Sequence, residues 1–135
     1  MKPKSLFDRI YLGDRYCKSF IREDDKKQLE IQVNCISLMR PGTSKWDFYT
    51  GGDIHDGWIV FSDVEEVALE PPDILPNDSI NEINAEADPD SAGRYRIEIS
   101  MGAVDHLGNY REVTLRAKSA TAHIEDSART IVQVS

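Results

Sequence analysis

The sequence predicts a mainly β protein, an antiparallel sandwich or open barrel of six to eight strands with one short N-terminal helix. Several segments alternate apolar and polar residues with the period of a half-buried strand. No segment has the period of a long amphipathic helix. The residues from Trp58 to Phe61 form an uninterrupted apolar run, which suits a strand that is buried on both faces or one that crosses a core edge.

The segment 57–72 is expected to hold the central strand. Its apolar residues change parity at Val64, so we predict a bulge or short turn at residues 62–63 that directs Val64 inward. Pro71 and Pro72 end the strand, because neither has a backbone N–H to donate to a ladder.

A short helix of about two turns is predicted near the N-terminus. Ser5 begins a Ser-x-x-Asp capping pattern, and Gly13 is placed as a C-terminal stop. A helix this short is not stable alone, so its apolar side chains Leu6, Phe7 and Ile10 are expected to pack on a sheet.

The clearest pair of strands is 94–103 and 111–118, in which the apolar residues of the alternation carry odd numbers. Directly opposed residues of an antiparallel pair share a face, so odd residues must pair with odd residues. This requires a loop of three or five residues around residues 107–109. The remaining strands are predicted at residues 15–22 and 28–39, as a second hairpin, and at residues 80–87, 120–125 and 131–134.

The length of 135 residues predicts a single domain spanning residues 1–135. No apolar run approaches the ~20 residues of a membrane span, and Asp8 and Arg9 interrupt the N-terminus before the apolar part of a signal peptide could form. The expected compartment is therefore the cytoplasm, with no membrane partner. In that reducing environment Cys17 and Cys35 are expected to be buried free thiols.

The net charge of −8 is concentrated in one segment. Residues 70–93 contain seven of the 24 acidic residues and no Lys or Arg. Such a segment repels the phosphate backbone of nucleic acids and attracts a basic protein or a cation. The alternative is a solvated acidic loop that serves solubility. The candidate binding residues in this segment are Asp73, Asp78, Glu82 and Glu86.

Aromatic residues cluster in sequence around a glycine-rich loop. Trp46 and Tyr49 precede Gly51-Gly52, and Trp58 follows them. Exposed aromatic side chains beside an acidic surface are typical of protein-recognition patches, so Trp46 and Tyr49 join the candidate binding residues. The alternative is that Trp46 and Trp58 cap the core.

The sequence offers no catalytic residue and requires no cofactor. It has no Gly-x-Ser-x-Gly elbow, phosphate-binding loop, dinucleotide-binding glycine pattern or His-Glu-x-x-His helix. The most site-like group is Asp53, His55 and Asp56, whose oxygen and imidazole donors could hold a divalent cation. A small metal-dependent enzyme built on this loop is thus an alternative function, although the spacing matches no known metal site.

The order of elements resembles that of small uncharacterised bacterial β-rich families. The resemblance consists of Tyr-Leu-Gly-Asp-Arg-Tyr-Cys at residues 11–17, an Ile-x-Phe-x-x-Val strand at residues 59–64, and late alternating strands. Some similar families are counted with toxin-immunity proteins. The resemblance implies an acidic partner that blocks a basic toxin domain, and it transfers no catalytic residues.

We therefore expect a non-enzymatic domain that binds another protein, with a basic protein as the candidate partner. A self-associating structural module built on edge strands is a further alternative, and the sequence leaves the oligomeric state open.

Overall fold

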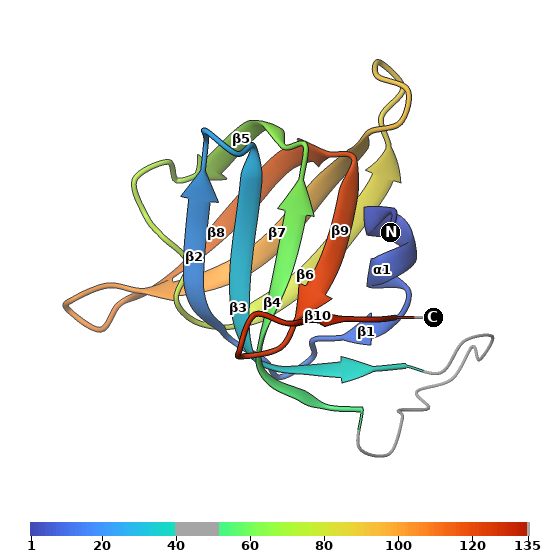
Figure 1. Cartoon of the computed structure of the whole chain (residues 1–135). Coiled ribbons are helices and arrows are strands. Elements are labelled where there is room, and N and C mark those ends of the chain that lie inside the picture. Colours follow the sequence, from blue (N-terminus) through green and yellow to red (C-terminus); the bar gives the residue numbers. More distant parts are fainter. Residues whose placement is uncertain (40–51, 135) are drawn as a thin grey trace.

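The computed structural model describes residues 1–39 and 52–134, and in them two antiparallel sheets pack face to face with one short helix, α1 (Pro3–Phe7), at their side (Figure 1). This confirms the predicted fold class, and the two sheets form a sandwich that does not close into a barrel. The described residues form ten strands rather than six to eight, because the two-residue strand β1 shows no alternation and the segment 57–72 contributes to two strands, β4 and β5.

The six-stranded sheet has the order β1-β3-β4-β9-β10, and β2 also pairs with β3. Its strands are β1 (Ile10–Tyr11), β2 (Cys17–Glu23), β3 (Gln28–Leu38), β4 (Ile54–Ser62), β9 (Thr121–Glu125) and β10 (Ile131–Val132). The run from Trp58 to Phe61 lies in the middle of β4 and is buried throughout, as predicted for a strand covered on both faces.

The four-stranded sheet has the order β5-β8-β7-β6. Its strands are β5 (Glu65–Glu70), β6 (Ile80–Ala87), β7 (Tyr95–Val104) and β8 (Tyr110–Ser119). The β7–β8 ladder runs from Tyr95 opposite Ser119 to Val104 opposite Tyr110, so the loop has five residues and odd residues pair with odd residues, as predicted. This loop projects from the body of the molecule (Figure 1).

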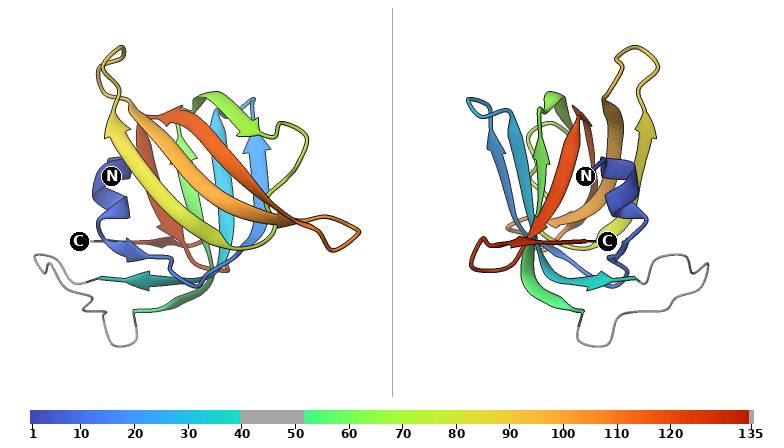
Figure 2. Two further views of the ribbon diagram at one scale, coloured as in Figure 1. Left: turned by 180° about the vertical axis from the view of Figure 1, so that it is seen from behind. Right: turned by 45° about the vertical axis from the view of Figure 1, so that its right-hand side comes forward.

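The core lies between the sheets. Its largest fully buried side chains come from both of them, and α1 adds Leu6 and Phe7. The ring of Phe7 meets that of Phe61 edge to face, with centroids 6.0 Å apart. Figure 2 shows α1 at the open side of the sandwich, where it contacts β6 and β9.

The predicted helix boundaries were wrong. The helix begins at Pro3 and ends at Phe7, with Lys2 as its N-cap and no side-chain capping bond. Proline is favoured in the first turn because its fixed φ suits a helix and its missing N–H leaves no orphan donor. Ser5 therefore lies inside the helix, and Ile10 begins β1 although it joins the core as expected.

One corner joins the two sheets. The chain passes from β4 to β5 and, beside it, from β8 to β9, so that Ser62 pairs with Thr121 in one sheet and Glu65 pairs with Lys118 in the other. Asp63 turns the first strand with a left-handed φ of 52°. This is the turn predicted at residues 62–63, and Val64 is directed inward as expected.

Ser119 satisfies backbone groups at this corner. Its fully buried hydroxyl lies 2.8 Å from the carbonyl oxygen of Ser62 and 2.9 Å from that of Thr121. The backbone N–H of Ala120 donates to the same Ser62 carbonyl at 3.2 Å. These bonds replace the ladder where both strands change sheet.

Cys17 and Cys35 are free and buried, as predicted. Burial raises the pKa of the Cys17 thiol to about 12. The thiol is therefore protonated at neutral pH, and a buried protonated thiol is a poor nucleophile.

We expect Ser119→Ala to lower the free energy of unfolding by about 1 to 2 kcal/mol, because a buried carbonyl loses its hydrogen-bond donor. Urea denaturation followed by circular dichroism measures this change. Ser100→Ala is the control, since Ser100 is half-buried on β7 and takes part in no side-chain hydrogen bond among the described residues. Equal stabilities of the two variants would contradict the role of Ser119.

The state of Cys17 predicts slow chemical modification. In a Cys35→Ser variant, a thiol reagent such as 5,5′-dithiobis(2-nitrobenzoic acid) at pH 8 should react with Cys17 only as fast as the protein opens. Reaction in the folded protein at the rate seen in urea would show that the thiol is accessible.

Candidate functional site

The outer face of the four-stranded sheet is covered with charged side chains. Strand alternation directs apolar residues such as Ile97 and Leu115 into the core and turns their neighbours Arg96, Glu98 and Arg116 outward. This face belongs to the strands that border the acidic segment predicted from the sequence.

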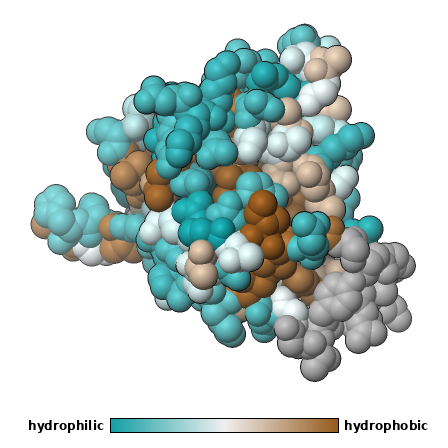
Figure 3. All heavy atoms as spheres, viewed as in Figure 1, coloured by the Kyte–Doolittle hydropathy of each residue, from teal (hydrophilic) through white to brown (hydrophobic). Residues whose placement is uncertain are grey.

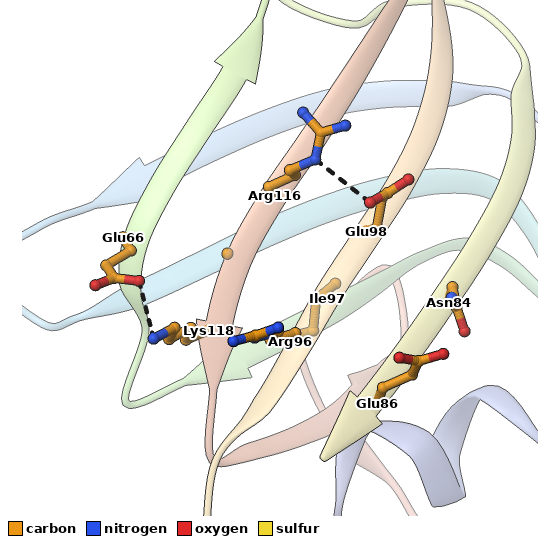
Figure 4. Close-up of a pocket in the computed structure, with 9 residues that line it drawn as sticks. Glu66, Asn84, Glu86, Arg96, Ile97, Glu98, Arg116 and Lys118 are labelled. Atoms are coloured by element: carbon orange, nitrogen blue, oxygen red, sulfur yellow. Dashed lines mark hydrogen bonds and ion pairs between the residues drawn. The ribbon is translucent and has the colours of Figure 1, made fainter. Parts of the chain in front are cut away.

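Two cations of β8 are each held between two carboxylates. Arg116 lies 2.6 Å from Glu70 and 3.3 Å from Glu98, and Figure 4 shows it turned toward Glu98 on β7. The hydrogen bond to Glu70 and the charge of Glu98 raise the pKa of Arg116. Lys118 lies 3.1 Å from both Glu66 and Asp88, and hydrogen bonds to these carboxylates raise its pKa.

Asp88 is the internal carboxylate of this network. Its side chain is fully buried, the N–H of Asp90 donates to it at 3.0 Å, and Arg96 lies 3.2 Å away. The Asp90 N–H, with Lys118 and Arg96, holds the pKa of Asp88 below its usual range although burial alone would raise it. Arg96 also pairs with Asp90 at 3.0 Å. Glu70, Asp88 and Asp90 are therefore neutralised within the fold.

The four acidic residues proposed for binding are the members of the segment 70–93 that form no ion pair with another described residue. Glu82 and Glu86 are exposed on β6, Asp73 is exposed before it, and Asp78 is half-buried. No ion pair between described residues includes any of the four. Residues 80–87 of the segment form β6, the strand predicted there, and most of its other residues lie in the connections on either side of this strand.

A groove crosses this face. It has a volume of about 390 Å³, and Glu86 and Asn84 of β6 lie on one side of it, with Arg96, Arg116 and Lys118 on the other (Figure 4). The three cations of the groove already contact carboxylates, whereas the side chains of Glu86 and Asn84 make no hydrogen bond or ion pair with another described residue. These two groups therefore keep their full bonding capacity for another molecule.

The two predicted aromatic binding residues, Trp46 and Tyr49, lie outside the described residues. Trp58 is buried on β4, where the guanidinium of Arg129 lies 4.3 Å from its ring centroid. Trp58 therefore packs within the fold, which agrees with the alternative interpretation for this residue.

The side chains of Asp53, His55 and Asp56, the alternative metal site, do not point toward a common centre. Asp53 and His55 are exposed, whereas the Asp56 carboxylate lies 2.7 Å from the ammonium group of Lys18. Among the described residues, no group of three His, Cys, Asp or Glu side chains is placed to hold a metal ion.

A model of one protein family matches the chain over residues 1–135. The chain belongs to DUF6258, a family of unknown function. No match to it was found among curated proteins, and none among solved structures. The DUF6258 chain has, in its described part, no helix that is long and apolar enough to cross a membrane.

The DUF6258 fold has a second polar cluster, on the outer face of the six-stranded sheet. Arg129 lies 2.6 Å from both Glu30 and Glu125, and the Nε2 atom of His123 lies 2.6 Å from the other oxygen of Glu125. Burial raises the pKa of Glu125, but the hydrogen bonds from Arg129 and His123 outweigh this effect and lower it. The cluster fastens the loop before β10 over Trp58.

This cluster occupies a different side of the molecule from the groove. Figure 3 shows the side of the six-stranded sheet, where apolar colour gathers around β10. Ile131 of β10 is exposed there, and the residues that line the groove belong to the other sheet. The groups of the cluster bind one another, so we assign it a structural role.

We expect Arg129→Ala to reduce the free energy of unfolding by about 2 kcal/mol at pH 7, because two poorly exposed carboxylates lose a charged hydrogen-bond donor. The control is Arg111→Ala, since Arg111 is exposed and forms no ion pair among the described residues. Denaturant unfolding of both variants measures the difference, and an unchanged Arg129→Ala protein would contradict the fastening role.

The loss of stability caused by Arg129→Ala should depend on pH. The folded-state pKa of Glu125 is lowered, so its stabilisation is present at neutral pH and is lost as the pH falls through that pKa. The stability difference between the wild type and Arg129→Ala should therefore shrink on acidification. A difference that grows toward low pH would oppose this assignment.

Proposed function

We propose that the protein is a non-enzymatic domain that binds another protein, a basic one, through the outer face of the four-stranded sheet. One observation carries the proposal. On this face the three cations are paired with internal carboxylates, while Glu82, Glu86, Asp73 and Asp78 have no counterion among the described residues. The face therefore carries an uncompensated negative potential, which attracts a positively charged partner.

The network gives this surface a fixed geometry. Arg116 bridges carboxylates of β5 and β7, and Lys118 bridges one of β5 and one of the turn after β6, so the side chains around the groove are held in place before a partner arrives. Binding to groups that are already ordered loses less conformational entropy than binding to mobile ones. A Lys or Arg of the partner would enter the groove beside Glu86.

Binding is better supported than catalysis. A nucleophile needs an adjacent base, and the Cys17 thiol is buried and protonated. The groove contains carboxylates and cations that neutralise one another, which suits recognition of charge rather than proton transfer.

The finer form of the proposal is an immunity-type inhibitor that blocks a basic toxin domain in a bacterial cytoplasm. It is supported by the resemblance of the element order to families counted with toxin-immunity proteins and by the free carboxylates of this face. Toxin domains that act on nucleic acids must attract phosphate groups, so their active surfaces are basic and complement such a face.

The test is affinity capture from a lysate of the source cells, identification of the recovered protein by mass spectrometry, and calorimetry with that purified protein at low and high salt. We expect one basic partner whose affinity falls with salt. A variant with Asp73→Asn, Asp78→Asn, Glu82→Gln and Glu86→Gln should raise Kd by at least about tenfold, or about 1.4 kcal/mol.

The matched control removes the same charge elsewhere, by Asp8→Asn, Asp24→Asn, Asp25→Asn and Asp53→Asn, all at exposed positions. It should bind like the wild type at moderate salt. An equal loss of affinity in both variants would show that net charge alone controls binding. It would contradict a binding site on the outer face of the four-stranded sheet. Growth arrest by the expressed partner, relieved by this protein but not by the first variant, would support the immunity role.

A further inference from the structure

Past its first residue, the outer edge of β6 is paired with no other described strand. The N–H of Asp88 donates to the carbonyl of Arg94 at 2.9 Å, which marks a hydrogen-bonded pair in the antiparallel β6–β7 ladder. Such pairs alternate with non-bonded ones along a ladder. Ile83, Ala85 and Ala87 therefore direct their N–H and C=O groups away from β7, and no hydrogen bond between described residues uses them.

The same edge already binds an antiparallel strand at its beginning. The N–H of Ile80 donates to the carbonyl of Arg15 at 2.9 Å, and the carbonyl of Asp78 accepts from the N–H of Cys17 at 2.8 Å. Tyr16 and Ser79 form the antiparallel bridge between these bonds. The chain then leaves the edge through Gly13, so the intramolecular ladder stops before Ile83.

An apolar groove opens where the chain leaves. It has a volume of about 360 Å³ and lies between residues 80–83 of β6 and a wall that includes Phe7, Ile10 and Leu12. Figure 2 shows β6 as the last strand of its sheet, with α1 next to it. A strand added along Ile83 to Ala87 would place one of its apolar side chains at this groove.

We propose that β6 is a docking edge that binds an extended basic segment of the partner as a fifth, antiparallel strand of this sheet. Main-chain hydrogen bonds to Ile83, Ala85 and Ala87 would give affinity, and the apolar groove would receive an alternate side chain. Glu82 and Glu86 select the occupant, because they attract Lys or Arg and repel a second copy of the same edge.

The basic character of this segment rests on the proposed function, and the edge itself is testable without the partner. The probe is the peptide acetyl-Lys-Val-Lys-Val-Lys-Val-Lys-amide, added up to about 1 mM to ¹⁵N-labelled protein. We expect chemical-shift changes along β6 and slower amide exchange at Ile83, Ala85 and Ala87, by about tenfold at a peptide concentration tenfold above Kd. The peptide with Glu in place of each Lys should produce neither effect.

Variants at Ala87 distinguish binding through backbone hydrogen bonds of the edge from binding through charge alone. Ala87→Pro removes an outward N–H and should abolish the protection, whereas Ala87→Ser keeps the N–H and should bind like the wild type. No response to the Lys peptide, protection at amides outside β6, or equal binding of Ala87→Pro would each overturn the docking edge. Protection of β6 by the peptide in a protein that recovers no basic partner would keep the edge and reject the proposed function.

Discussion

The structure depends on the corner at which two neighbouring strands leave one sheet and enter the other together. Backbone groups that lose their ladder partners there would be costly if they stayed buried without bonds. The single O–H of Ser119 is shared between the carbonyls of Ser62 and Thr121, and Arg94 donates to the carbonyl of Asp63 at 2.9 Å while pairing with Glu65. Because both crossovers are fixed side by side, the register of one sheet determines that of the other, and with it which side chains face outward.

This fixed register explains the free negative charge on the outer face of the four-stranded sheet. The outward positions of β8 and β7 supply cations, and the carboxylates that reach them come from β5, from β7 and from the turn after β6. Arg96, Arg116 and Lys118 are all ion-paired in this way, so none of them neutralises the acidic side chains of β6, which face solvent. A protein surface with ordered internal pairs and a free acidic margin combines rigidity with an unbalanced field.

Local alternation predicted the parts of the fold that depend on neighbouring residues. It predicted a loop with an odd number of residues between β7 and β8, the turn before Val64 and the buried run in β4. It could not show which acids are neutralised, because the partners of Asp88 come from β7 and β8. It also missed the Arg129 cluster, since Glu30 lies 99 residues away and reaches Arg129 only through the packing of β3, β4 and β9.

The late position of β9 has a consequence during synthesis. β4 is complete at Ser62, but the strand that pairs with its other side, β9, begins only at Thr121. While residues 63–120 are being synthesised, one edge of β4, the most apolar strand, has no strand to pair with. Non-local pairing of this kind is slow and leaves the chain open to aggregation while it waits. A ribosome-associated chaperone that shields apolar segments would therefore be expected to raise the yield of the folded protein.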